Sequence, residues 1–160
     1  MKRCMVIGKT NVGKTLFVIK FADYLGVRNL AVTIRYPDHA LASQTVSLEQ
    51  ALREWVSAAP HHTRALHGVR LEIPVGKGAK EFEIVDTAGL IEGIPKETGI
   101  RRAMAQTLAM VREADLVLHM VDAAQAAAKG AVEAFGEDDF QVAQFAQMKG
   151  GYVIRANKMD

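Results

Sequence analysis

The chain is predicted to fold as an α/β protein with three layers, in which helices cover both faces of a mostly parallel sheet. Two observations indicate this class. Apolar runs typical of buried strands alternate with helical patterns along the 160 residues, and a glycine-rich loop joins the first strand to the first helix. Such alternation is typical of parallel strands connected by helices. Ligands of this architecture bind at the carboxyl ends of the strands.

The elements follow in order from these runs. Strands are predicted at 3–7, 69–73, 82–85, 116–121 and 152–154, and helices at 14–25, 100–113 and 139–148. The turn Gly76-Lys77-Gly78 joins two of the strands as a hairpin, so one strand is expected to run antiparallel to the others. The alanine-rich segment 123–136 is compatible with a helix or a loop, and its structure stays open.

The connection between the first helix and this hairpin is long and contains structure of its own. Ser47 to Gln50 form a capping box, and apolar residues then recur at helical spacing, which predicts an amphipathic helix. The run 30–36 is compatible with a strand that Pro37 ends, and its role stays open.

The glycine-rich loop carries the strongest chemical signal. It consists of Gly8, Lys9, Thr10, Asn11, Val12, Gly13, Lys14 and Thr15, and the helix continues with Leu16. Glycines at both ends allow backbone N–H groups to turn inward around a phosphate, Lys14 adds charge, and the Thr15 hydroxyl can bind Mg²⁺. The helix dipole favours the same anion. The pattern indicates a P-loop, which binds a nucleoside triphosphate.

Two further motifs refine this prediction. Asn157, Lys158, Met159 and Asp160 form an NKxD pattern, whose last carboxylate can accept hydrogen bonds from the N1–H and exocyclic amine of guanine. Adenine offers no such donor pair, so guanine is favoured. A strand also ends at Asp86 and continues to Gly89. Asp86 would hold Mg²⁺ through water, and the Gly89 N–H would bind the γ-phosphate. Taken alone, the NKxD pattern is a weak signal that is also common in turns and helix caps, and the strand end at Asp86 is more typical of an ordinary turn.

Together these motifs resemble those of the P-loop GTPases of the translation-factor (TRAFAC) class, and within it the Era, Der and Obg group. The segment 86–93 looks like the entry to switch II of Obg-like GTPases, and the loop with Asn11 is similar to that of Era and Der. The resemblance implies a P-loop NTPase fold and a GTP-binding switch that hydrolyses GTP. It also implies GTP or GDP as ligand and Mg²⁺ on Thr15 and Asp86.

The resemblance further implies an Mg²⁺-binding threonine in switch I. Thr63 is the candidate, because it stands a few residues before the strand 69–73, whereas Thr33 and Thr45 are more distant alternatives. The chain would then carry an enlarged switch I insertion at 27–62.

The resemblance also bears on the rate of hydrolysis. Leu90 follows Gly89 where Ras-like GTPases carry a glutamine that orients water, so slow intrinsic turnover is expected. Relatives with an asparagine at the place of Asn11 can bind K⁺ beside the phosphates, which implies Asn11 as a K⁺ ligand and, with Lys14 and Thr63, as a catalytic group. Alternatively, Asn11 only accommodates an unusual backbone angle.

Length and composition are compatible with one domain. The chain has a net charge of +2, 49% hydrophobic residues and one cysteine, and it contains no apolar run of transmembrane length. A cytoplasmic location is therefore expected. Because GTPases of this group continue beyond NKxD with a strand and a helix, 1–160 is interpreted as a G domain that is incomplete at its C-terminus. An effector protein or the ribosome and its RNA are open as partners.

Two other functions stay open. Lys9 occupies the position of the signature lysine of MinD- and ParA-like ATPases, which would imply an ATP-driven, nucleotide-dependent dimer. Leu90 is also compatible with a non-catalytic nucleotide-binding interaction module. The NKxD motif and the hairpin before Asp86 favour the GTPase.

Overall fold

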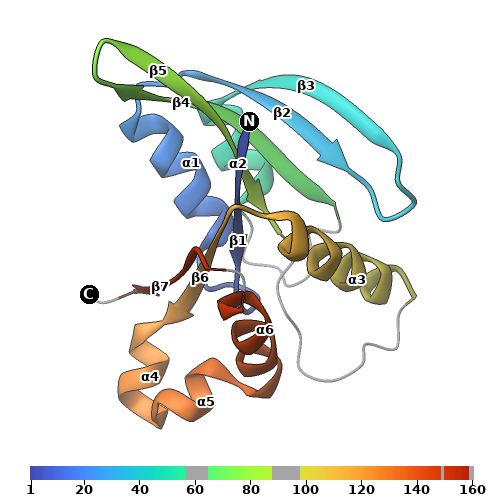
Figure 1. Ribbon diagram of the computed structural model, residues 1–160, viewed down its shortest axis with the longest axis vertical. Coiled ribbons are helices and arrows are strands. Elements are labelled where there is room, and N and C mark those ends of the chain that lie inside the picture. The colour runs from blue at the N-terminus through green and yellow to red at the C-terminus, as the bar shows by residue number, and fades with distance from the viewer. Residues whose placement is uncertain (57–64, 88–97, 149, 159–160) are drawn as a thin grey trace.

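The computed structural model of the chain describes residues 1–56, 65–87, 98–148 and 150–158. Its strands are β1 (Lys2–Ile7), β2 (Asn29–Arg35), β3 (Leu41–Ser47), β4 (Leu66–Val75), β5 (Gly78–Asp86), β6 (Leu116–Asp122) and β7 (Tyr152–Asn157). Its helices are α1 (Lys14–Tyr24), α2 (Leu48–Trp55), α3 (Thr98–Glu113), α4 (Ala123–Lys129), α5 (Ala131–Phe135) and α6 (Glu137–Gln147). Figure 1 shows helices on both sides of the sheet, as predicted for the fold class.

The described strands form one seven-stranded sheet in the order β3-β2-β4-β5-β1-β6-β7. β1 pairs in parallel with β5 and β6, and β6 pairs in parallel with β7. The other pairings, β5–β4, β4–β2 and β2–β3, are antiparallel. The prediction of a single antiparallel strand is therefore wrong for the described strands, because β3 as well as β4 runs against the rest. The cause is the β2–β3 hairpin, which extends the sheet beyond β4.

Each face of the sheet has its own apolar core. On one face, α1 and α2 pack on β1, β2, β4 and β5, with Val18, Ile19, Leu30, Ala51, Val69 and Ile84 among the buried residues. On the other, α3 and α6 pack on β1, β5 and β6, with Met5, Ile7, Val85, Val111, Val117 and Val142 buried. The two clusters fix the helices against the sheet and so hold the loops at the strand ends in place.

Local signals account for the boundaries of several elements. The Ser47 hydroxyl accepts a hydrogen bond from the Gln50 N–H at 3.2 Å, which confirms the predicted cap of α2. The segment 123–136, left open by the sequence, forms α4 and α5. The Asp122 carboxylate caps α4 by accepting from the Gln125 N–H at 3.0 Å, and Gly130, with φ 95°, separates the two helices.

No described helix is both long enough and apolar enough for a membrane span.

An ion-pair network joins strands across the sheet. The buried Glu83 carboxylate on β5 binds Arg3 of β1 at 2.8 Å and Arg35 of β2 at 2.6 Å. Gly68 of β4 lies beneath these side chains, and a Cβ there would collide with both the Glu83 carboxylate and the Arg35 guanidinium. The network therefore ties the β2–β3 hairpin to the central parallel strands across a glycine of the intervening strand.

Candidate nucleotide-binding site

The predicted motifs of the described chain meet at one edge of the sheet. β5, β1, β6 and β7 run in the same direction, so their carboxyl ends lie together. The loop 8–15 follows β1, Thr87 follows β5, Asp122 ends β6 and Asn157 ends β7. This is the edge at which α/β sheets bind ligands.

The backbone of the loop turns through several left-handed conformations. Gly8 has φ 140°, Asn11 has φ 61° and Gly13 has φ 99°. A Cβ at Gly8 would collide with the Met120 carbonyl oxygen, and one at Gly13 would collide with the Asn157 amide. Glycine is thus required at both ends by conformation and by space. The angle at Asn11 agrees with the reading in which asparagine accommodates an unusual backbone.

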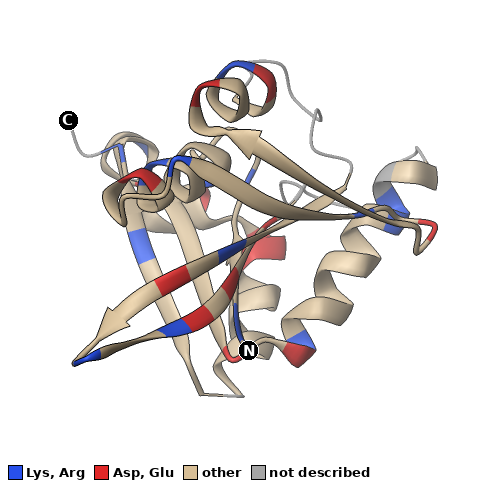
Figure 2. Ribbon diagram, turned by 90° about the horizontal axis from the view of Figure 1, so that it is seen from above, with Lys and Arg blue, Asp and Glu red and all other residues tan. Residues whose placement is uncertain are grey.

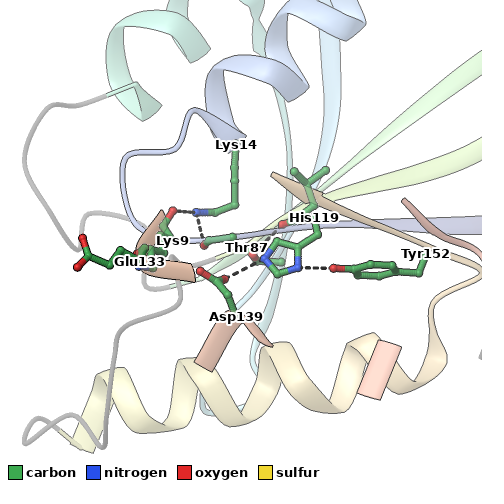
Figure 3. Close-up of polar contacts among 9 residues, drawn as sticks. Lys9, Lys14, Thr87, His119, Glu133, Asp139 and Tyr152 are labelled. Atoms are coloured by element: carbon green, nitrogen blue, oxygen red, sulfur yellow. Dashed lines mark hydrogen bonds and ion pairs between the residues drawn. The ribbon is translucent and has the colours of Figure 1, made fainter. Parts of the chain in front are cut away.

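Lys14 lies inside the loop. Its side chain is buried, and its ammonium donates hydrogen bonds to the carbonyl oxygens of Gly8 at 2.9 Å and Lys9 at 2.8 Å (Figure 3). Burial lowers the pKa of Lys14 to about 8, and the carboxylates of Asp86 and Asp139 offset part of this shift. The ammonium is therefore held in the centre of a loop that can surround a phosphate.

Thr15 and Asp86 form a pair suited to a hard cation. The Thr15 hydroxyl donates to Asp86 Oδ2 at 2.6 Å, whereas Oδ1 is buried and has no hydrogen-bond partner in the described part of the chain. Burial raises the pKa of Asp86 to about 6, against the hydrogen bond from Thr15 and the charge of Lys14. A hydroxyl and an unsatisfied carboxylate oxygen fit Mg²⁺, which prefers a few oxygen ligands together with water and phosphate.

The described residues contain no group of three or more His, Cys, Asp or Glu side chains that could hold a metal ion on its own. An Mg²⁺ ion at Thr15 and Asp86 would therefore depend on phosphate and water for its remaining ligands, as is usual for this ion.

The NKxD segment reaches the P-loop from the other end of the chain. The Asn157 amide donates to the Val12 carbonyl oxygen at 2.8 Å. Lys158 donates to Asp122 Oδ2 at 2.9 Å, and this hydrogen bond is the main cause that lowers the pKa of Asp122. The first two residues of the motif thus connect β7 to the loop and to the end of β6.

Lys9 points toward α5. Its ammonium donates to the Glu133 carbonyl oxygen at 3.1 Å (Figure 3). Beside it lies a small cavity of about 80 Å³, lined by Lys9, Thr10, Asn11, Val12, Met120, Val121, Asp122, Gln125, Ala134, Asp139 and Lys158. The Lys9 side chain therefore contacts its own chain in this structure.

A buried hydrogen-bond network centred on His119 lies near the site. His119 of β6 contacts the Asp139 carboxylate through Nε2 at 2.9 Å and the Tyr152 hydroxyl through Nδ1 at 2.8 Å (Figure 3). Burial raises the pKa of Tyr152 to about 12, so its hydroxyl remains protonated. Because His119 stands inside an apolar run, its imidazole is expected to find a partner at the sheet, and Tyr152 of β7 is such a partner. The run itself gives no indication of Asp139. The available signal was a histidine inside the apolar strand 116–121, whereas Asp139 lies in the acidic first turn of α6.

Other predicted site residues lie outside the described residues. These are Thr63, Gly89, Leu90 and Asp160. The proposed γ-phosphate contact, the third Mg²⁺ ligand and the guanine carboxylate therefore stay predictions from the sequence. Thr87, next to the described end of β5, donates from its hydroxyl to the Val6 carbonyl oxygen at 2.7 Å and so fixes the end of β5 to β1.

The α/β/α fold and the phosphate-binding loop at its strand ends define a P-loop NTPase domain. Comparison with known proteins assigns the family: the chain belongs to the family described as 50S ribosome-binding GTPase, whose model matches residues 3–158.

The chain is also similar to a curated protein and to a solved structure. GTPase Obg of Fusobacterium nucleatum subsp. nucleatum is 29% identical over 111 residues, which cover 66% of this chain and 25% of that protein. A crystal structure of an Era variant from Aquifex aeolicus, bound to GDP and AlF4⁻, matches the fold with a TM-score of 0.52 and 17% identity. That match covers all of this chain and 42% of the Era chain. The chain thus spans less than half the length of either protein.

Proposed function

We propose that the chain binds GTP and GDP with Mg²⁺ and hydrolyses GTP slowly, as a molecular switch. The observation that carries this proposal is the contact between the P-loop and the NKxD segment, in which the Asn157 amide binds the Val12 carbonyl oxygen at 2.8 Å. This contact places the phosphate-binding loop beside the strand end from which Asp160 would reach guanine. The family and the Obg relative support the same activity.

The residues have distinct roles in this proposal. Lys14 exchanges its hydrogen bonds to the loop carbonyls for bonds to the β- and γ-phosphates, and loop N–H groups surround the phosphates. Thr15 and Asp86 hold Mg²⁺, with Thr63 as the switch I ligand. When bound, the ion neutralises charge that develops on the phosphates during water attack. Gly89 binds the γ-phosphate through its N–H, and Asp160 selects guanine.

The region 27–62 is proposed to be an enlarged switch I insertion. Its described part consists of β2, β3 and α2, which pack on the domain through Leu30, Leu48 and Ala51.

We also propose a cytoplasmic location and the ribosome or an effector protein as partner. Figure 2 shows both signs of charge along β4 and β5. With a net charge of +2, RNA contact would therefore depend on a local surface.

Phosphate release from GTP and ATP, measured in KCl and in NaCl, tests the activity. We expect phosphate release from GTP only. The rate should be low, because Leu90 cannot orient water, and it should be higher in KCl than in NaCl.

Asn11→Ala should abolish the stimulation by K⁺ while GDP affinity stays within about twofold, since a cation beside the phosphates acts on the transition state. Stimulation that persists in Asn11→Ala would remove the K⁺ role, and release from ATP would contradict the proposal. GTP binding without release would favour the non-catalytic module.

A further inference from the structure

We propose that His67 is a positioning residue of the Mg²⁺ site. Its imidazole would bind the water that Asp86 holds on the ion, and Trp55 would fix the orientation of the imidazole ring. This inference rests on the proposed binding of Mg²⁺ and guanine nucleotide. It assigns a role to a histidine outside the P-loop, NKxD and Asp86 motifs.

The first step is the register of β4 and β5. His67 lies directly opposite Asp86 in this antiparallel pair. Directly opposed residues have side chains on the same face, with their Cβ atoms about 5 Å apart. The Asp86 carboxylate binds Thr15 of α1, and the His67 ring lies against Trp55 of α2. Both helices cover the same face of the sheet, so both side chains point to the same side.

The second step is a pair of unsatisfied polar atoms. Asp86 Oδ1 and His67 Nδ1 are both buried, and neither has a hydrogen-bond partner in the described ranges. An unpaired buried polar atom destabilises a protein, so two such atoms on opposed residues are unusual unless a ligand satisfies them. A water on Mg²⁺ can donate one hydrogen to the Asp86 carboxylate and the other to an imidazole nitrogen. Protein groups that hold metal ligands in this way tune metal affinity.

The third step is the support of the imidazole ring. The ring centroids of Trp55 and His67 are 4.8 Å apart, with an interplanar angle of 36°. Trp55 is the last residue of α2 and is partly buried against the core that contains α1. The indole therefore limits the orientations of the ring. Because Trp55 is the only tryptophan of the chain, its emission reports directly on this pair.

The test is Mg²⁺ affinity of the GDP complex, measured by calorimetry and by Trp55 emission in the full chain. His67→Phe keeps a ring against Trp55 but removes the polar atoms, and should weaken Mg²⁺ binding by about tenfold, within the 10–100-fold range of outer-ligand substitutions. GDP affinity in EDTA should stay at the wild-type value. His67→Asn, whose amide stands near the position of Nδ1, should restore at least part of the Mg²⁺ affinity. His39→Asn, at an exposed turn, is the matched control.

Wild-type Mg²⁺ affinity in His67→Phe would overturn this inference alone. An equal loss of GDP affinity with and without Mg²⁺ would also overturn it, because it would indicate a structural defect. The wild-type protein gives an independent measurement: Mg²⁺ added to the GDP complex should change Trp55 emission with the calorimetric midpoint, and an unchanged emission would contradict the inference. Failure of wild type to bind guanine nucleotide at all would overturn the proposed function and this inference together.

Discussion

Asp86 is a carboxylate whose position favours ligand binding over stability of the free protein. It is 2% exposed, and one of its oxygens has no partner in the described part of the chain. Burial disfavours the charged form and raises the pKa from 3.8 to about 6. Such a residue is expected at a site where a cation supplies the missing interaction.

This shift predicts a pH-dependent stability of the nucleotide-free protein. Between pH 3.8 and about 6 the folded state binds more protons at Asp86 than the unfolded state, so the free energy of unfolding falls as pH rises through this window. Asp86→Asn lacks this dependence. At pH 7 without ligand, the variant should be more stable than wild type, by up to about 3 kcal/mol. Urea unfolding at pH 4 and pH 7 measures the difference, and parallel pH profiles would contradict it. With Mg²⁺ and GDP, the order should reverse.

Residue-level prediction from sequence succeeded where chemistry is encoded locally. The P-loop glycines lie in contiguous sequence, and the structure gives a conformational reason for each. The contacts of His119 were harder to predict, because Asp139 and Tyr152 reach it only after α6 and β7 have packed around β6. His67 lies in β4, and its ring contacts Trp55 of α2. This contact could not be predicted from the sequence, because it depends on how α2 packs against the sheet.

At the scale of elements, α2 illustrates how a local signal defines a helix. Its first turn carries the Ser47 cap and Glu49, and its apolar side packs beside α1. The cap and the helical spacing were both visible in the sequence. The β2–β3 hairpin was only partly visible, because the place of β2 beside β4 depends on register with a strand that is distant in the sequence.

Removing the cap of α2 tests this element. Ser47→Ala should reduce the free energy of unfolding by about 1 kcal/mol, because the N–H of Gln50 loses its partner. Ser47→Thr should retain most of the stability, and Ser43→Ala, at an exposed position of β3, is the control. Chemical denaturation measures all three variants. A Ser47→Ala protein as stable as the Ser43→Ala control would show that the packing of α2, and not its cap, determines the stability of this region.

At the scale of the whole molecule, Glu83 connects the antiparallel extension to the parallel half of the sheet. Its carboxylate binds Arg3 and Arg35, which come from strands on either side of the β4–β5 pair. The pairing depends on four strands being in register, so it could not be inferred from any single segment.

Removal of the Glu83 charge should therefore weaken the fold as a whole. Glu83→Gln leaves two partly buried guanidinium groups without their carboxylate and should cost about 3 kcal/mol, as for other buried pairs that lose one partner. Glu81→Gln, on the exposed part of the same strand, should change the stability by less than about 0.5 kcal/mol. Thermal and urea unfolding measure both variants. Equal stability of the two would contradict a role of the network in joining the two halves of the sheet.

The central claim is that this fold brings a phosphate-binding loop and a guanine-recognition segment to one site. Calorimetric titration of nucleotide-free protein with GDP, GTP and ATP in Mg²⁺ buffer tests it most directly, with Lys14→Ala as the matched variant. The account predicts binding of GDP and GTP, at least about 100-fold weaker binding of ATP because the guanine donors are missing, and loss of GTP binding in Lys14→Ala. Preference for ATP, or GTP affinity unchanged by Lys14→Ala, would contradict it.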